Sequence, residues 1–224
     1  MVIHQMPRIV AAMVAAVSFV VASAAIGDSP PAVSPDGLHL VKNTEFALVY
    51  VKPGASLKPY SRFAILDCPV TFAQGWRNDI EDSYDVPITD DQIKQMETAL
   101  SAEFKSVFTA QLEAGGYQLV NFAAPDVLVL RPAIINLAPS APQTGWDPSM
   151  QTFATSAGQM TLFLELYDSV TSQLLARIVD PQSASNFGAF MWQSGASNHA
   201  AADEIMTKWS DTLRHYMEAA HDAQ

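Results

Sequence analysis

The 224-residue sequence predicts an α+β fold, with a mainly antiparallel sheet and two principal helices packed on one of its faces. Two observations lead to this prediction. Apolar residues recur with helical spacing in two segments, one in the middle of the chain and one at its end. Runs of β-forming residues, bounded by Pro, Gly and Asp, fill much of the remainder. The expected order of elements is β-β-α-β-β-β-β-α.

The N-terminal segment is typical of an export signal. Residues 1–8 carry one cation, Arg8, and an apolar run follows from Ile9 to Ala22. Ala22-Ser23-Ala24 has the small residues that a signal peptidase recognises, so we expect residues 1–24 to be a signal peptide, with cleavage after Ala24 or Ala25. The alternative is an uncleaved membrane anchor, because the length of the run approaches the roughly 20 apolar residues that a helix needs to span a bilayer. Its many alanines make its hydrophobicity modest for that role.

Cysteine content and charge limit the function further. A lipoprotein signal needs a cysteine directly after the cleavage site, but the only cysteine is Cys68, so we expect a periplasmic chain without a lipid anchor. A single cysteine also cannot form an internal disulfide. The chain has 12 Lys and Arg against 23 Asp and Glu, a net charge of −11, and the predicted signal contains one of the cations. Such an acidic chain is not expected to bind nucleic acid.

The first part of the mature chain predicts a tether and two strands. Residues 25–36 are expected to be a flexible tether because they are rich in Pro, Ser and Ala, and residues 37–224 are expected to form a single α+β domain. Residues 46–51 and 62–68 have the composition of strands. Pro53-Gly54 predicts a turn between them.

A long helix is predicted from Thr89 to Gly115. Thr89-Asp90-Asp91-Gln92 forms a capping box, in which the threonine and glutamine side chains each bond an amide at the helix start. The apolar face is expected to contain Ile93, Met96, Leu100, Phe104, Val107 and Leu112. Gly115-Gly116 then ends the helix.

The second half of the chain predicts four strands and a final helix. Strands are expected at residues 117–122 and 127–137, the latter an edge or bulged strand because it contains Pro132. Residues 159–167 alternate between apolar and polar, and residues 174–179 return as the second arm of a hairpin. The last helix is expected to start at Asn198 and to bury Trp209.

Strand and turn patterns in three regions resemble a known family. They are Leu48-Val49-Tyr50-Val51-Lys52-Pro53-Gly54-Ala55 through Tyr60, Leu130-Arg131-Pro132-Ala133-Ile134, and Ala157-Gly158-Gln159-Met160-Thr161 through Asp168-Ser169-Val170-Thr171. The chain is similar to the bacterial envelope lipoproteins catalogued as domain of unknown function 3313. This resemblance implies an exported α+β domain, usually lipid-anchored on the periplasmic side, without an activity that could be transferred. The missing lipobox cysteine favours a soluble periplasmic form.

Three tryptophans in glycine-bearing loops are the candidate partner-binding residues: Trp76 with its neighbour Arg77, Trp146, and Trp192. A large rigid ring offers contact area at low entropic cost, and its N–H can bond across an interface. The same rings could instead be lids over the ends of the core, which is the interpretation we favour.

No pattern of catalytic or metal-binding residues is recognisable. Cys68 ends an apolar strand and is expected to be buried and inert. His199 and Asp203 share a helix face but lack a third ligand. The acidic residues 79–85 lack the calcium-loop pattern and are expected to form a solvated loop.

The sequence therefore predicts a non-enzymatic accessory protein of the cell envelope without a cofactor. Its expected partner is an envelope protein, a cell-wall component or the membrane surface. The alternative is a periplasmic module that binds a small apolar or glycan ligand between the loop tryptophans. An enzyme of unrecognised type is the third option.

Overall fold

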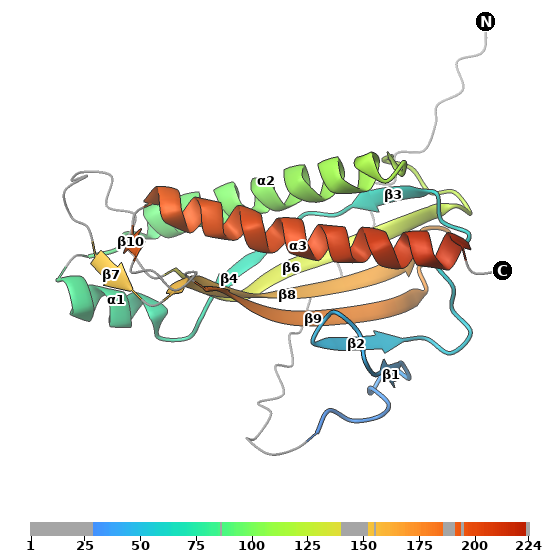
Figure 1. Ribbon diagram of the computed structural model, residues 1–224, viewed down its shortest axis with the longest axis horizontal. Helices are drawn as coiled ribbons and strands as arrows, with labels where there is room; N and C mark the ends of the chain where they lie inside the picture. Colours follow the sequence, from blue (N-terminus) through green and yellow to red (C-terminus); the bar gives the residue numbers. More distant parts are fainter. Residues whose placement is uncertain are drawn as a thin grey trace, which may run out of the picture.

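The computed structural model describes residues 29–85, 87–139, 152–154, 156–185, 191–193 and 195–222. It confirms the α+β class: two long helices pack side by side on one face of an eight-stranded, mostly antiparallel sheet (Figure 1). The helices are α1 (Trp76–Tyr84), α2 (Asp90–Ala114) and α3 (Gly195–Asp222). The strands are β1 (His39–Val41), β2 (Leu48–Val51), β3 (Arg62–Ile65), β4 (Val70–Phe72), β5 (Gln118–Leu119), β6 (Val127–Pro139), β7 (Thr152–Ala154), β8 (Ser156–Asp168), β9 (Leu174–Ser185) and β10 (Met191–Gln193).

The sheet has the order β1-β2-β9-β8-β6-β3-β5, and β4 also pairs with β6. The β8–β9 hairpin is the one predicted. The two N-terminal strands, however, are not neighbours: β2 pairs with β1 and β9, whereas β3 runs parallel to β6 and β5. The turn at Gly54, whose φ is 77°, bends the chain but does not decide which strands pair.

Pro132 lies in the central strand β6, not in an edge strand. The Leu130 carbonyl accepts a hydrogen bond from Leu66 and the Ile134 amide donates to Pro69, so both residues direct their backbone toward β3 and β4. The backbone nitrogen of Pro132, between these two residues, points toward the same edge of β6. At that position it lies opposite the gap between the end of β3 and the start of β4. A missing N–H therefore costs no sheet hydrogen bond there. The expected irregularity lies further along, as a register shift between Ile135 and Ala138.

Two helix starts differ from expectation. The capping box of α2 is confirmed, with the Thr89 hydroxyl accepting from the Gln92 amide at 3.2 Å. Helix α3, however, begins at Gly195, so Asn198 lies within its first turn and is not its cap. The acidic segment predicted to be a solvated loop is mostly helix α1. Its N-cap is Gly75 in a left-handed conformation without a side-chain hydrogen bond, so the sequence contained no capping signal.

The main core fills the space between the sheet and the two long helices. Trp209 is buried with Ile205 and Leu213, as the helical spacing predicted. The Trp209 indole donates to Oδ2 of Asp180 at 2.7 Å, and Oδ1 of this buried carboxylate accepts from the Ala47 amide at 2.7 Å. Asp180 therefore links α3, β9 and the start of β2. Among the described residues, no helix has the length and apolarity needed to cross a bilayer.

Cys68 is buried in the same core, with 3% of its surface exposed. Burial raises the pKa of its thiol to about 12, so almost no thiolate exists at neutral pH. We therefore expect a thiol reagent at pH 7 to label the native protein at least about a hundredfold more slowly than the urea-unfolded chain. Equal labelling rates would show that the thiol is accessible in the native state.

Candidate binding surface on the helix-free sheet face

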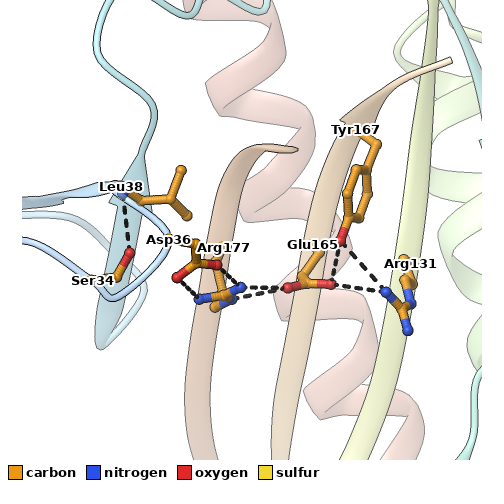
Figure 2. Close-up of polar contacts among 7 residues, drawn as sticks. All are labelled: Ser34, Asp36, Leu38, Arg131, Glu165, Tyr167 and Arg177. Atoms are coloured by element: carbon orange, nitrogen blue, oxygen red, sulfur yellow. Dashed lines mark hydrogen bonds and ion pairs between the residues drawn. The ribbon is translucent and has the colours of Figure 1, made fainter. Parts of the chain in front are cut away.

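The face of the sheet opposite α2 and α3, here called the helix-free face, carries a row of charged side chains. Arg131 of β6 lies beside Glu165 of β8, which lies beside Arg177 of β9. Side chains alternate between the two faces of a strand, so their apolar neighbours Leu130, Leu164 and Ile178 face the core. Figure 2 shows the three charged side chains in line across the strands, on the side away from the helices.

Glu165 is the centre of this row and only 6% of its surface is exposed. Its Oε1 accepts hydrogen bonds from Nε and Nη2 of Arg177 at 3.0 and 2.8 Å. Its Oε2 accepts from the Tyr167 hydroxyl at 2.8 Å. Burial, together with this carboxylate, raises the pKa of Tyr167, which keeps the phenol protonated as a donor. Both oxygens of the buried carboxylate are therefore satisfied, as a buried charge requires.

Arg131 is bound much less tightly than Arg177. Its Nη1 lies 3.5 Å from both Glu165 Oε2 and the Tyr167 hydroxyl oxygen, at the long limit for a hydrogen bond. Its side chain is 35% exposed. Among the described residues, its Nε and Nη2 donate to no acceptor. This guanidinium therefore retains hydrogen-bonding capacity that faces solvent.

An N-terminal turn covers the other end of the charged row (Figure 2). Asp36 forms a two-pronged ion pair with Arg177, and this hydrogen bonding lowers the pKa of the Asp36 carboxyl. The turn is closed by the Ser34 hydroxyl, which accepts from the Leu38 amide at 3.1 Å. Tyr50, which neighbours Arg177 on β2, donates its hydroxyl to the Pro31 carbonyl at 2.8 Å. Residues 31–36 thus contact the sheet through these hydrogen bonds, whereas the domain boundary expected at residue 37 stays a prediction.

Apolar side chains share this sheet face with Arg131; one of them, Phe163, also lies under the Arg177 guanidinium, whose central carbon is 5.8 Å from the ring centroid. The open part of the helix-free face is defined here by the partly or fully exposed side chains of Leu66, Val129, Arg131, Ile135 and Phe163. Leu66, which is 39% exposed, follows β3 directly and bonds to the backbone beside Arg131. The surface therefore combines one cation with an apolar surround, a composition typical of interaction sites.

We expect Glu165→Ala to lower the free energy of unfolding by about 1–3 kcal/mol, because Arg177 and Tyr167 would both lose their buried acceptor. Arg177 would keep its ion pair with Asp36, which limits the loss of stability. Glu165→Gln retains the shape and one acceptor oxygen and should cost less than half as much. Urea unfolding measures both. Variants within about 0.5 kcal/mol of wild type would show that the row does not stabilise the fold.

The structure places Trp76 in the interior and not on a recognition surface. It forms a second, smaller core with Ile80 and Ile88, and 5% of its surface is exposed. Its ring stacks on Phe72 at 4.5 Å between centroids, and its indole donates to the Pro139 carbonyl at 2.9 Å. Trp76 is therefore buried, which favours the lid interpretation over a surface anchor.

Arg77 connects α1 to the start of α2. It forms ion pairs with Glu81 at 3.2 Å and Asp90 at 2.8 Å, and it donates to the Ile88 carbonyl. Its half-exposed side chain is therefore engaged within the protein. Trp192 lies in β10, whose backbone pairs with β7, and Trp146 lies outside the described residues. A shared surface of the three tryptophans stays a prediction.

A depression of about 390 Å³ lies at the C-terminal ends of α2 and α3. It is lined by Ser61, Gly115, Gly116, Tyr117, Glu218, His221 and Asp222. None of its described lining residues is a tryptophan, and its walls are mainly polar. Its described lining differs from the apolar or glycan site that the alternative function places between the loop tryptophans. Within the described chain, no three His, Cys, Asp or Glu side chains converge as metal ligands.

Several solved structures are similar to this chain at low sequence identity. The PelC dodecamer from Paraburkholderia phytofirmans is 14% identical, covering 73% of this chain and 96% of the other, with a TM-score of 0.38. A minor lipoprotein from Acinetobacter baumannii is 10% identical, with coverages of 71% and 94% and a TM-score of 0.35. A DUF4136 family protein from Bacteroides thetaiotaomicron is 15% identical, with coverages of 75% and 95% and a TM-score of 0.37.

A comparison with curated protein sequences finds no match. The sequence profile described as "Protein of unknown function (DUF3313)" matches residues 33–213. The match begins within the N-terminal turn that covers Arg177 and ends in the last helix, so it includes the whole sheet and the charged row. This chain belongs to the DUF3313 family.

Proposed function

We propose that the protein is an exported, non-enzymatic accessory protein of the cell envelope that binds a partner through the open part of its helix-free face. The observation that carries this proposal is the composition of that surface. An antiparallel sheet can leave one face to solvent, but the outward residues are then mainly polar. Here Val129, Ile135 and Phe163 point outward around an incompletely bonded arginine.

The family assignment and the N-terminal sequence support the cellular part of the proposal. The family that the sequence resembles is an exported one, and the predicted signal peptide also favours a location outside the cytoplasm. We expect the mature protein to begin at Ala25 or Ile26 and to fractionate with soluble periplasmic proteins. Mass spectrometry of the purified protein gives the first residue. An intact Met1, or a lipid on any residue, would contradict this expectation.

Site-specific photocrosslinking in intact cells tests the binding surface. A crosslinking amino acid at Leu66 or Val129 is expected to capture a partner, because both positions lie in the open part of the helix-free face. The same amino acid at Lys105 or Glu113, exposed positions on α2, is the matched control. Capture only at the α2 positions, or no capture from the sheet positions, would refute the proposed surface.

A further inference from the structure

We infer, building on the proposed function, that the partner presents an extended protein segment in which a carboxylate is flanked by apolar side chains. Arg131 binds the carboxylate, and the side chains around Arg131 contact the apolar flanks.

The charges of the helix-free face show an asymmetry that points to an anionic ligand. Among the described residues, the two carboxylates that belong to the row, Asp36 and Glu165, both bond Arg177. At the β3 side, Asp126 accepts from Nε of Arg62 at 2.7 Å. Of the described charged side chains of the row, the Arg131 guanidinium is therefore the one that keeps unused hydrogen-bonding capacity, and it is a donor.

The geometry of Arg131 suits a carboxylate in particular. A guanidinium is planar and presents its N–H groups as a fork, which matches the two oxygens of a carboxylate. At one edge of this fork, Nη1 lies 3.5 Å from Glu165 Oε2, which is the long limit for a hydrogen bond. Among the described residues, Nε and Nη2 have no acceptor. The side chain is one-third exposed, so a bond to a partner would be partly shielded from water.

The apolar surround defines what should lie beside the carboxylate. Leu66 on the β3 side, and Val129 on β6 next to Arg131, are within reach of the same extended segment. In an extended chain, residues i and i+2 point to the same side about 7 Å apart. A segment with an acidic residue between apolar residues two positions away would therefore place the carboxylate on Arg131 and the apolar groups around it.

A second copy of the chain is the alternative occupant. The full sequence carries a net charge of −11, and removal of the predicted signal with Arg8 makes each copy more negative, so two copies repel each other over long range. A partner that offers only a local carboxylate within an apolar segment avoids most of this repulsion. Occupation by a second copy would be detected as a covalent dimer in the experiment below.

The test combines the Leu66 photocrosslinker with a substitution at Arg131. In the full-length protein in cells, Arg131→Gln should reduce the crosslink yield at least about tenfold, whereas Lys105→Gln, which removes a cation from α2, should not. Mass spectrometry of the crosslinked peptide should locate an Asp, a Glu or a C-terminus within about three residues of the crosslink. Arg131→Lys keeps the charge without the fork and should give an intermediate yield.

A synthetic peptide that copies the crosslinked segment provides the second measurement. Changing its carboxylate to the amide should raise the Kd for the wild-type protein about tenfold and leave the Kd for Arg131→Gln nearly unchanged. Thermal unfolding of each variant checks that the fold is intact; the long Arg131 contacts make a large loss unexpected. Should Arg131→Gln prove unfolded, the peptide pair and Arg131→Lys still decide the question.

Three outcomes would overturn the inference. The first is full crosslink yield in Arg131→Gln, and the second is a crosslinked segment without a carboxylate. Either result would reject the proposed carboxylate chemistry of the partner but not the docking surface. The third is a covalent dimer of the chain, which would assign the surface to self-association. Loss of all crosslinks from the sheet positions in the wild-type protein would instead reject the proposed function itself.

Discussion

Replacing Trp209 by alanine is expected to lower the free energy of unfolding by about 3–5 kcal/mol. The side chain is 1% exposed and fills the space between α3 and the sheet, so its loss leaves a cavity. It also removes the indole donor from the buried carboxylate of Asp180. Denaturant unfolding followed by circular dichroism measures the change.

Trp209→Phe separates the two contributions. Phenylalanine preserves most of the apolar volume but cannot donate to Asp180. The loss in the free energy of unfolding should therefore be about 1–3 kcal/mol, the cost of an unsatisfied buried polar group. A loss below about 1 kcal/mol in the alanine variant would contradict the burial of this helix face.

Trp76→Ala is expected to cost about 3–4 kcal/mol, because the ring is the largest member of the small core formed with Ile80 and Ile88. The indole bond to the Pro139 carbonyl, which ties α1 to the end of β6, would be lost as well. The unfolding midpoint in urea should fall accordingly.

The same variant distinguishes a lid from a recognition residue. An unchanged midpoint with weaker partner capture would restore Trp76 as a surface anchor. Phe122 offers a control, since it is an aromatic residue that is 45% exposed and lies against the Arg62 guanidinium, whose central carbon is 5.1 Å from the ring centroid. Phe122→Ala should therefore change stability by no more than about 1 kcal/mol.

Elements with strong local signals were predictable from the sequence. The capping box at Thr89 defined the start of α2, and the alternation of residues 159–167 defined the long arm of the β8–β9 hairpin. Trp209 was assigned to the core because its spacing from Ile205 and Leu213 is helical. In each case the relevant contacts lie within one element or between adjacent ones.

Elements that depend on distant partners were not predictable. Strands β1 and β4 have three residues each, which is too short to show a periodicity. Helix α1 has a polar sequence and a glycine N-cap, so it resembled a solvated loop. Its burial of Trp76 depends on Phe72 and Pro139, which lie on the paired strands β4 and β6.

The charged row was missed for the same reason. Glu165 and Tyr167 were recognised only as the polar side of an alternating strand, and Arg131 only as part of a family-like pattern. Their association depends on the register of three strands, and a shift of one residue would send each side chain to the opposite face. The alternation itself could have indicated that a glutamate and two arginines share one face.

The placement of β9 between β2 and β8 has a consequence for how the protein acquires its structure. The bond from Ala47 to Asp180 joins residues 133 positions apart, and α3 contributes Met206, Trp209 and Leu213 to the core. Contacts of such high sequence separation form slowly. The N-terminal half therefore cannot complete its sheet or its core until β9 and the last helix have been synthesised. A nascent chain with this topology lacks its complete core until its synthesis is almost finished.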